Sequence, residues 1–183
     1  MRNRELARLS IFAALIAVFG LMPRLDIPFA AGVPITAQTL GVMLAGLLLG
    51  PRLAAMSVAL FLLVVACGAP LLSGGRGGLG VFAGPTAGYL VGWIFGAFVI
   101  GFLLVRIRMK SPFLAALSSS LVGGILVIHL IGAPWLAWAA GLTLPQAFLA
   151  SATFLPGDML KAIAAAYVYR LHHARVSRSE RNA

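Results

Sequence analysis

Acidic residues are scarce in this chain of 183 residues, which has four Asp and Glu against 14 Lys and Arg. Charged residues of both signs make up only 10% of the sequence, and hydrophobic residues make up 61%. A typical soluble domain has about 25% charged residues. The chain therefore has too few polar groups to cover itself in water, and its composition predicts a membrane protein that crosses the bilayer several times.

Other absences exclude classes of function. Cys67 is the only cysteine, which excludes an intramolecular disulfide and a metal site built from cysteines. The sequence has no GxxxxGK[ST] phosphate-binding loop, so any ATP hydrolysis would have to come from another protein. Away from the termini the only carboxylates are Asp26 and Asp158, too few for an acidic proton relay. We expect no catalytic residue, no metal and no cofactor.

Six apolar segments, each near the roughly 17–25 residues that span a bilayer, follow one another along the chain. They cover residues 6–22, 36–50, 53–67, 86–105, 113–133 and 146–169. The second and third are short, and the Gly50-Pro51-Arg52 junction between them predicts a tight antiparallel hairpin. We expect an all-α membrane protein with six transmembrane helices in a single domain, 1–183, whose basic tail from about 170 to 183 is disordered.

The basic residues predict the orientation in the membrane. They precede the first segment, separate the second from the third and the fourth from the fifth, and follow the sixth, whereas the opposite loops hold only Arg24 and Arg76. By the positive-inside rule this alternation places both termini in the cytoplasm. The net charge of +10 is thus explained without a nucleic-acid partner, because the basic residues are not interleaved with aromatics on one polar face.

Glycine and alanine patterns indicate how the chain packs. A glycine-rich segment, 71–85, surrounds Arg76, and its apolar Leu79, Val81 and Phe82 favour a lid over a flexible linker. Gly88, Gly92 and Gly96 recur every four residues, a spacing that lets helix backbones approach closely and favours internal packing. Ala13 and Ala17 form a similar small patch, which fits internal packing or the docking of another membrane subunit.

Two ionisable groups lie within the last apolar segment. Asp158 and Lys161 are three residues apart, just after Pro156-Gly157. Each such group costs roughly 2.5–3.5 kcal/mol inside a membrane helix, so their presence indicates a polar task. At this spacing they could neutralise each other, and a helix-internal ion pair is one interpretation. The other is a ligand site on a helix interrupted at Pro156, because broken helices are tolerated where they line a cavity.

Three further polar residues lie in the apolar segments. Gln38, near the outer end of the second segment, offers donors and an acceptor to a neighbouring helix or to a ligand. Tyr89, at the outer end of the fourth segment, fits a ligand site or the membrane interface. His129 stands alone in the fifth segment and is interpreted as a packed, hydrogen-bonded side chain rather than a ligand.

Three blocks of sequence resemble one known family. VPITAQTLGVMLAGLLLGPR, GGRGGLGVFAGPTAGYLVG and FLPGDMLKA occur in the order and spacing of the BioY family, the biotin-binding membrane subunits of energy-coupling factor (ECF) transporters. The resemblance covers nearly the whole chain. It implies the six-helix bundle of an ECF substrate-binding (S) component, with the glycine-rich outer loop capping a biotin site, in a bacterial cytoplasmic membrane.

The resemblance also implies roles for residues and partners. Asp158 and Lys161 would bond the polar groups of biotin, and Gln38, Arg76 and Tyr89 would complete or close the pocket. Ala13 and Ala17 would dock a transmembrane coupling subunit, and separate ATPase subunits would supply energy. Whether the chain forms a homo-oligomer is left open. The alternatives are an S component for another small vitamin, a membrane-embedded enzyme, and a structural or channel-like protein.

Overall fold

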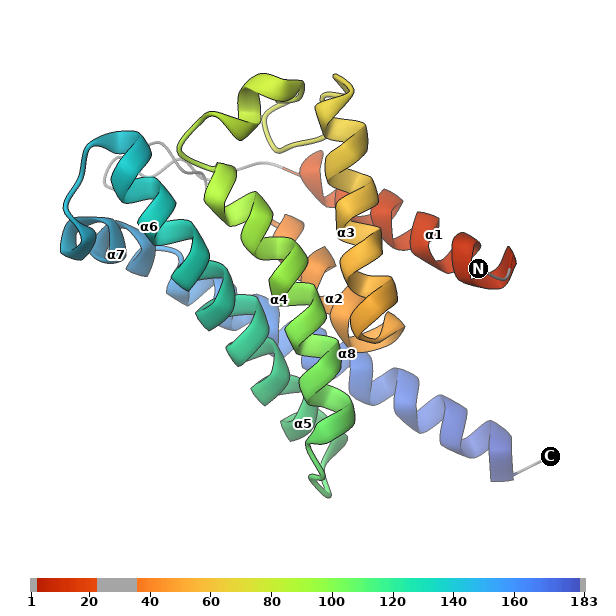
Figure 1. The fold of residues 1–183 in the computed structure, drawn as a ribbon. Helices are drawn as coiled ribbons and strands as arrows, with labels where there is room; N and C mark the ends of the chain where they lie inside the picture. Colours follow the sequence, from red (N-terminus) through yellow and green to blue (C-terminus); the bar gives the residue numbers. More distant parts are fainter. Residues whose placement is uncertain (1–2, 23–35, 182–183) are drawn as a thin grey trace.

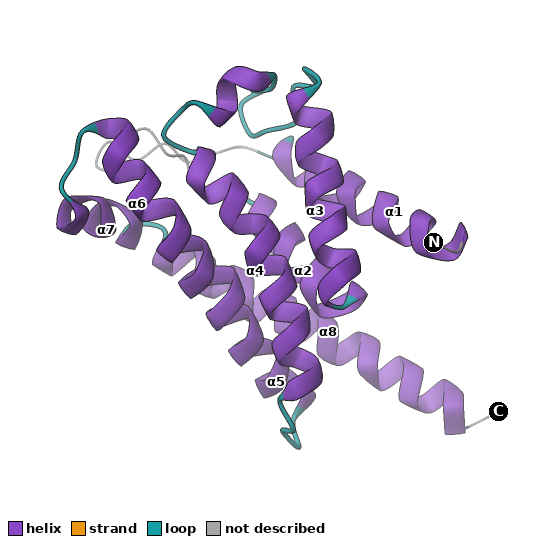
Figure 2. Cartoon of the chain, viewed as in Figure 1, coloured by secondary structure: helices purple, strands orange, loops and turns teal. Residues whose placement is uncertain are grey.

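The computed structural model describes residues 3–22 and 36–181, and these residues fold into a bundle of helices (Figures 1 and 2). Within these ranges the extended backbone is limited to one isolated bridge between Leu72 and Arg76. The proline-containing segment 23–34 lies outside the described residues. The helices are α1 (Asn3–Gly20), α2 (Gln38–Leu49), α3 (Pro51–Ala66), α4 (Ala87–Arg106), α5 (Pro112–Ser120), α6 (Ile128–Ala140), α7 (Leu144–Ala152) and α8 (Leu155–Arg181).

The first four predicted segments correspond to α1 to α4 with small shifts at their ends. The expected hairpin between α2 and α3 is confirmed: Gly50 has a positive φ of 78°, and Pro51 begins α3 directly after it. Only glycine adopts this backbone conformation without strain, and proline suits the first position of a helix because its missing N–H would be unpaired there.

The fifth and sixth segments differ from the prediction. The fifth runs as one continuous helix over Pro112–Ala140, formed by α5, a π-helical stretch at Leu121–Val127 (η3) and α6. The sixth is two helices, α7 and α8, separated by a turn at Thr153 and Phe154. Hydropathy could not reveal this turn, because both sides of it are apolar.

The end of α8 corrects a second expectation. The tail from 170 was expected to be disordered, but α8 continues to Arg181 and extends away from the bundle toward the C-terminus (Figure 1). The exposed stretch from Arg170 to Arg175 contains good helix formers such as Leu171 and Ala174.

Small residues set the distance between helices. Gly92 and Gly96 of α4 face Ile128, and an added Cβ at either would lie 3.1 and 2.7 Å from the nearest backbone oxygen. The prediction that the Gly88–Gly92–Gly96 face packs internally is therefore confirmed, against η3 and α6. Ala13 also points inward: it is buried in the core shared with α2 and α3, and Ala17 packs against the same core. The internal packing that these small residues favoured is thus observed for Ala13, while Ala17 remains partly exposed.

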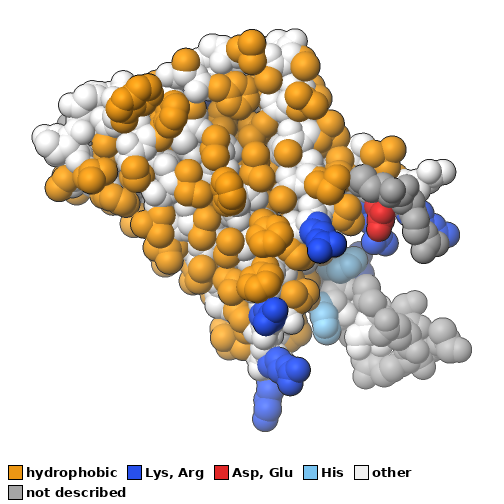
Figure 3. Space-filling model, in the orientation of Figure 1, with side chains coloured by type: hydrophobic (Ala, Val, Ile, Leu, Met, Phe, Trp, Pro, Cys, Tyr) orange, Lys and Arg blue, Asp and Glu red, His pale blue; other side chains and the backbone are white. Residues whose placement is uncertain are grey.

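The outer surface of the bundle is apolar. Exposed large hydrophobic side chains occur on all the long helices, among them Ile11, Leu63, Phe95, Leu126 and Leu160. In the view of Figure 3, hydrophobic side chains cover most of the bundle, and Lys and Arg gather toward its lower and right-hand ends. By length and composition, α4 and Pro112–Ala140 could each cross a membrane, whereas α2 and α3 are shorter. Apolar surface of this extent is characteristic of a protein surrounded by lipid.

Candidate functional site

A single cavity brings together residues from five parts of the chain. It is lined by the start of α2, the glycine-rich loop, the N-terminal half of α4, the start of α6, and the turn and first residues of α8. The volume that the centre of a water molecule can reach inside it is about 60 Å³. The lining residues are Thr36, Gln38, Thr39, Leu72, Arg76, Thr86, Tyr89, Leu90, Trp93, Ile128, His129, Phe154, Asp158 and Lys161.

Asp158 and Lys161, near the start of α8, form an ion pair at this cavity. Lys161 Nζ lies 2.8 Å from Asp158 Oδ1, and the Asp158 side chain is only 5% exposed. Thr39 of α2 joins them: Lys161 Nζ donates to Thr39 Oγ1 at 2.9 Å, and Thr39 Oγ1 donates to Asp158 Oδ1 at 3.2 Å. The sequence left two interpretations of this pair, a helix-internal ion pair and a ligand site. The structure is compatible with both, because the two side chains bond to each other and also line a cavity.

The local sequence explains why Asp158 lies where it does. Pro156 was expected to interrupt a continuous helix. It instead lies in the first turn of α8, where the backbone N–H that proline lacks is not needed. Asp158 lies in the same first turn, and its N–H donates to the carbonyl of Phe154 at 2.9 Å. The positive end of the helix dipole therefore favours the carboxylate.

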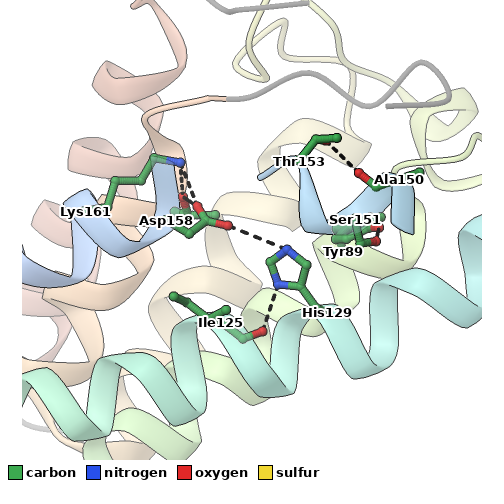
Figure 4. A network of polar contacts seen from close by, with 9 residues as sticks. Tyr89, Ile125, His129, Ala150, Ser151, Thr153, Asp158 and Lys161 are labelled. Carbon is green, nitrogen blue, oxygen red and sulfur yellow. Dashed lines mark hydrogen bonds and ion pairs between the residues drawn. The ribbon is translucent and has the colours of Figure 1, made fainter. Parts of the chain in front are cut away.

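His129 was predicted to be a packed, hydrogen-bonded side chain, and it is buried and bonded at one ring nitrogen, but it also lines the cavity. It projects from α6 toward Asp158 (Figure 4), and its Nε2 lies 3.7 Å from Asp158 Oδ2. Its Nδ1 lies 2.8 Å from the carbonyl oxygen of Ile125, at the π-helical stretch that precedes α6. Sequence reasoning missed this because it looked for partners near His129 in sequence, whereas Asp158 is on another helix.

Gln38 lines the cavity, but its side-chain polar atoms are hydrogen-bonded to other parts of the protein. Its Nε2 donates to the carbonyl of Leu71 at 3.2 Å and approaches that of Ile16 at 3.4 Å, and its Oε1 accepts from the N–H of Ser73 at 3.1 Å. The side chain is 1% exposed. Gln38 therefore fastens the glycine-rich loop to α1 and α2 at the edge of the cavity.

The glycine-rich loop contributes Leu72 and Arg76 to the cavity. Leu72 is buried in the core, and Arg76 Nε donates to the carbonyl of Ser73 at 3.3 Å. Gly74, Gly75 and Gly78 adopt positive φ, which lets the loop turn back over the bundle. The segment is thus packed against the helices, in contrast to a flexible linker.

Tyr89 forms the aromatic wall of the cavity. It is buried, its hydroxyl is hydrogen-bonded to Ser151 of α7 (Figure 4), and its ring meets those of His129 and Phe154 edge-on. Gly132 of α6 makes room for this ring, because an added Cβ would lie within 2.6 Å of Tyr89 Cγ. Apolar and aromatic surface therefore surrounds one part of the cavity, beside the polar cluster at α8.

All five residues predicted to bind substrate line this one cavity: Gln38, Arg76, Tyr89, Asp158 and Lys161. The lining residues that were not predicted to bind substrate include Thr39, Trp93, His129 and Phe154. The position of Thr39, one residue after Gln38 in the sequence, could have indicated that it also belongs to the site. Trp93 and Phe154 gave no such indication, because an aromatic side chain in an apolar segment does not show which way it faces.

Comparison with known proteins gives a consistent result. The sequence profile described as "BioY family" matches residues 1–178. A protein of Rhizobium etli named biotin transporter BioY is 49% identical, covering 93% of each chain. A probable biotin transporter BioY of Bacillus subtilis is 45% identical, covering 90% of this chain and 87% of its own. A crystal structure of the S component for biotin from an ECF-type ABC transporter is similar with a TM-score of 0.86 and 33% identity, covering 95% of each chain.

Proposed function

Because the chain belongs to the BioY family, we propose that it captures biotin and takes it up across the cytoplasmic membrane as the substrate-binding subunit of an ECF-type ABC transporter. The observation that carries this proposal is the cavity, in which an Asp–Lys–Thr cluster faces aromatic and aliphatic surface. A helical bundle that matches a biotin S component over 95% of its length supports it.

The cavity suits the chemistry of biotin. Biotin has a fused ring with a thioether, a neutral ureido group that donates and accepts hydrogen bonds, and a carboxylate on an aliphatic tail. Tyr89, Trp93 and Phe154 offer apolar surface to the ring and tail, and both acceptors and donors are available at Asp158 and Lys161. Arg76 supplies a further cation on the side of the glycine-rich loop.

The residues divide into two roles. Asp158, Lys161, Arg76 and Tyr89 contact the ligand, and Gln38 holds the loop that covers it. Since the described chain is one closely packed bundle, residues 1–183 act as a single membrane-embedded domain. The exposed apolar surface and the distribution of basic residues support several membrane crossings with both termini in the cytoplasm.

Transport energy comes from partner subunits in this proposal. The sequence contains no P-loop, so the protein binds substrate without being an ATPase itself, and it works with a transmembrane coupling subunit and ATPase subunits. With Ala13 buried, the surface of α1 open to such a partner is the opposite one, which carries Ile11, Ala14 and Val18.

The test is binding of radiolabelled biotin to the purified protein in detergent. We expect saturable binding by the wild type, competed by unlabelled biotin and not by thiamine or riboflavin. Asp158→Asn should lose at least tenfold in affinity, whereas the control Arg108→Gln, far from the cavity, should not. Folded wild-type protein that binds no biotin would refute the proposal, and competition by another vitamin would assign it a different substrate.

A further inference from the structure

We propose that His129 contacts the substrate directly, with its Nε2 accepting a hydrogen bond from an N–H of the ureido ring. This inference rests on the biotin-binding function proposed above. It gives a specific task to a side chain whose sequence context suggested only packing.

The hydrogen bond at the other ring nitrogen fixes the tautomer. His129 Nδ1 lies 2.8 Å from the carbonyl oxygen of Ile125. A carbonyl oxygen can only accept, so Nδ1 carries the hydrogen. In the neutral ring Nε2 then has a lone pair and no hydrogen, and it acts as an acceptor. The π-helical stretch Leu121–Val127 ends just before this residue, and such stretches often occur at functional sites.

That acceptor has no partner among the described residues. Nε2 is buried and makes no hydrogen bond there, and the residue as a whole is 9% exposed. Its charged neighbour, Asp158 Oδ2, is 3.7 Å away, which is too long for a hydrogen bond, and it is itself an acceptor. Buried polar atoms in folded proteins are nearly always bonded, so an unbonded one at the wall of a cavity indicates a missing donor.

The surroundings define what that donor is. The other oxygen of Asp158, Oδ1, accepts from Lys161 and Thr39, and Tyr89 and Phe154 flank the imidazole with their rings. Two acceptors, Nε2 and Asp158 Oδ2, therefore face the same part of the cavity. A carboxylate would be repelled there, whereas an uncharged N–H satisfies both. Of the polar groups of biotin, only the ureido ring supplies one.

The experiment compares biotin with its two analogues that carry a methyl group on one ureido nitrogen. Binding is measured by calorimetry for the wild type, His129→Leu and His129→Gln, with His172→Leu on the exposed part of α8 as a matched control. We expect His129→Leu to weaken biotin binding about tenfold, because the buried ligand N–H loses the acceptor that Nε2 supplies. His129→Gln keeps an acceptor and should stay within about threefold of the wild type.

The analogues identify the contact. The analogue whose methyl group replaces the hydrogen donated to His129 should bind weakly to the wild type. For that analogue, His129→Leu should change the affinity by less than about twofold. An equal loss from His129→Leu for biotin and both analogues would overturn the inference, as would unchanged biotin binding. If His129→Leu does not fold, the biotin affinities of His129→Gln and His129→Ala are compared instead. Equal affinities of these two variants would mean that the acceptor at this position is not used, and would also overturn the inference. Failure of the folded wild type to bind biotin would instead refute the proposed function.

Discussion

Neutralising Asp158 and Lys161 singly and together separates their contribution to stability from their contribution to binding. Lys161→Met would leave the Asp158 carboxylate, 5% exposed, with Thr39 as its remaining hydrogen-bond donor among the contacts described. Removing one partner of a buried ion pair costs about 3–5 kcal/mol. The Lys161 side chain is 15% exposed, so water weakens the pair and the lower figure applies. For a chain of this size about 3 kcal/mol lowers the Tm by about 6–12 °C.

The double variant Asp158→Asn/Lys161→Met has no unpaired charge. Replacing a buried pair by neutral groups of similar size is often neutral for stability. We therefore expect its Tm to return to within about 4 °C of the wild type while biotin binding remains lost. Unfolding of the ligand-free protein in detergent, followed by tryptophan fluorescence, gives the Tm, and calorimetry gives the affinity.

Two results would refute this reasoning. Biotin binding by the double variant at wild-type affinity would mean that the pair only holds itself together and that ligand contacts lie elsewhere. A double variant as unstable as Lys161→Met would mean that the two charges are not energetically coupled, despite the 2.8 Å between them. Arg108→Gln serves as the control for a charge change outside the cavity.

Two further predictions concern the walls of the site. Gly132→Ala should displace the Tyr89 ring and weaken biotin binding at least tenfold, whereas Gly80→Ala, where an added Cβ meets nothing within 4 Å, should leave affinity unchanged in the same calorimetric measurement. Gln38→Leu should destabilise the protein by about 1–3 kcal/mol, because buried partners lose their bonds, and hydrogen exchange should show lost protection at the Ser73 amide; retained protection would exclude the anchoring role.

Much of the fold could be predicted from the sequence because long apolar segments leave few choices. In a bilayer every backbone group must bond internally, so an apolar run of sufficient length becomes a helix. The all-helical class and the BioY family are confirmed. The turn at Thr153 and Phe154 was missed because it interrupts the backbone without changing hydropathy, and the extension of α8 was missed because polarity alone does not exclude a helix.

In the candidate site, contacts set by the local sequence could be predicted, whereas contacts set by helix packing could not. Asp158 and Lys161 could be found because charge is rare inside an apolar segment, and their contact needs only a spacing of three residues. Thr39 and His129 meet Asp158 from helices far away in sequence, and that depends on how α2 and α6 pack against α8. The sequence left Ala13 open for a related reason, since a small residue fits equally well at an internal contact and at a docking surface.

The position of the polar cluster at the start of α8 accounts for how this bundle tolerates it. The carboxylate of Asp158 lies at the positive end of a helix dipole and is bonded to Lys161 and Thr39, so its charge is compensated without a ligand. Within this described cluster, Oδ2 and the neighbouring Nε2 of His129 keep acceptor capacity toward the cavity. A site arranged in this way is stable when empty and still leaves a defined place for an uncharged N–H, which favours a neutral hydrogen-bonding head over an ion.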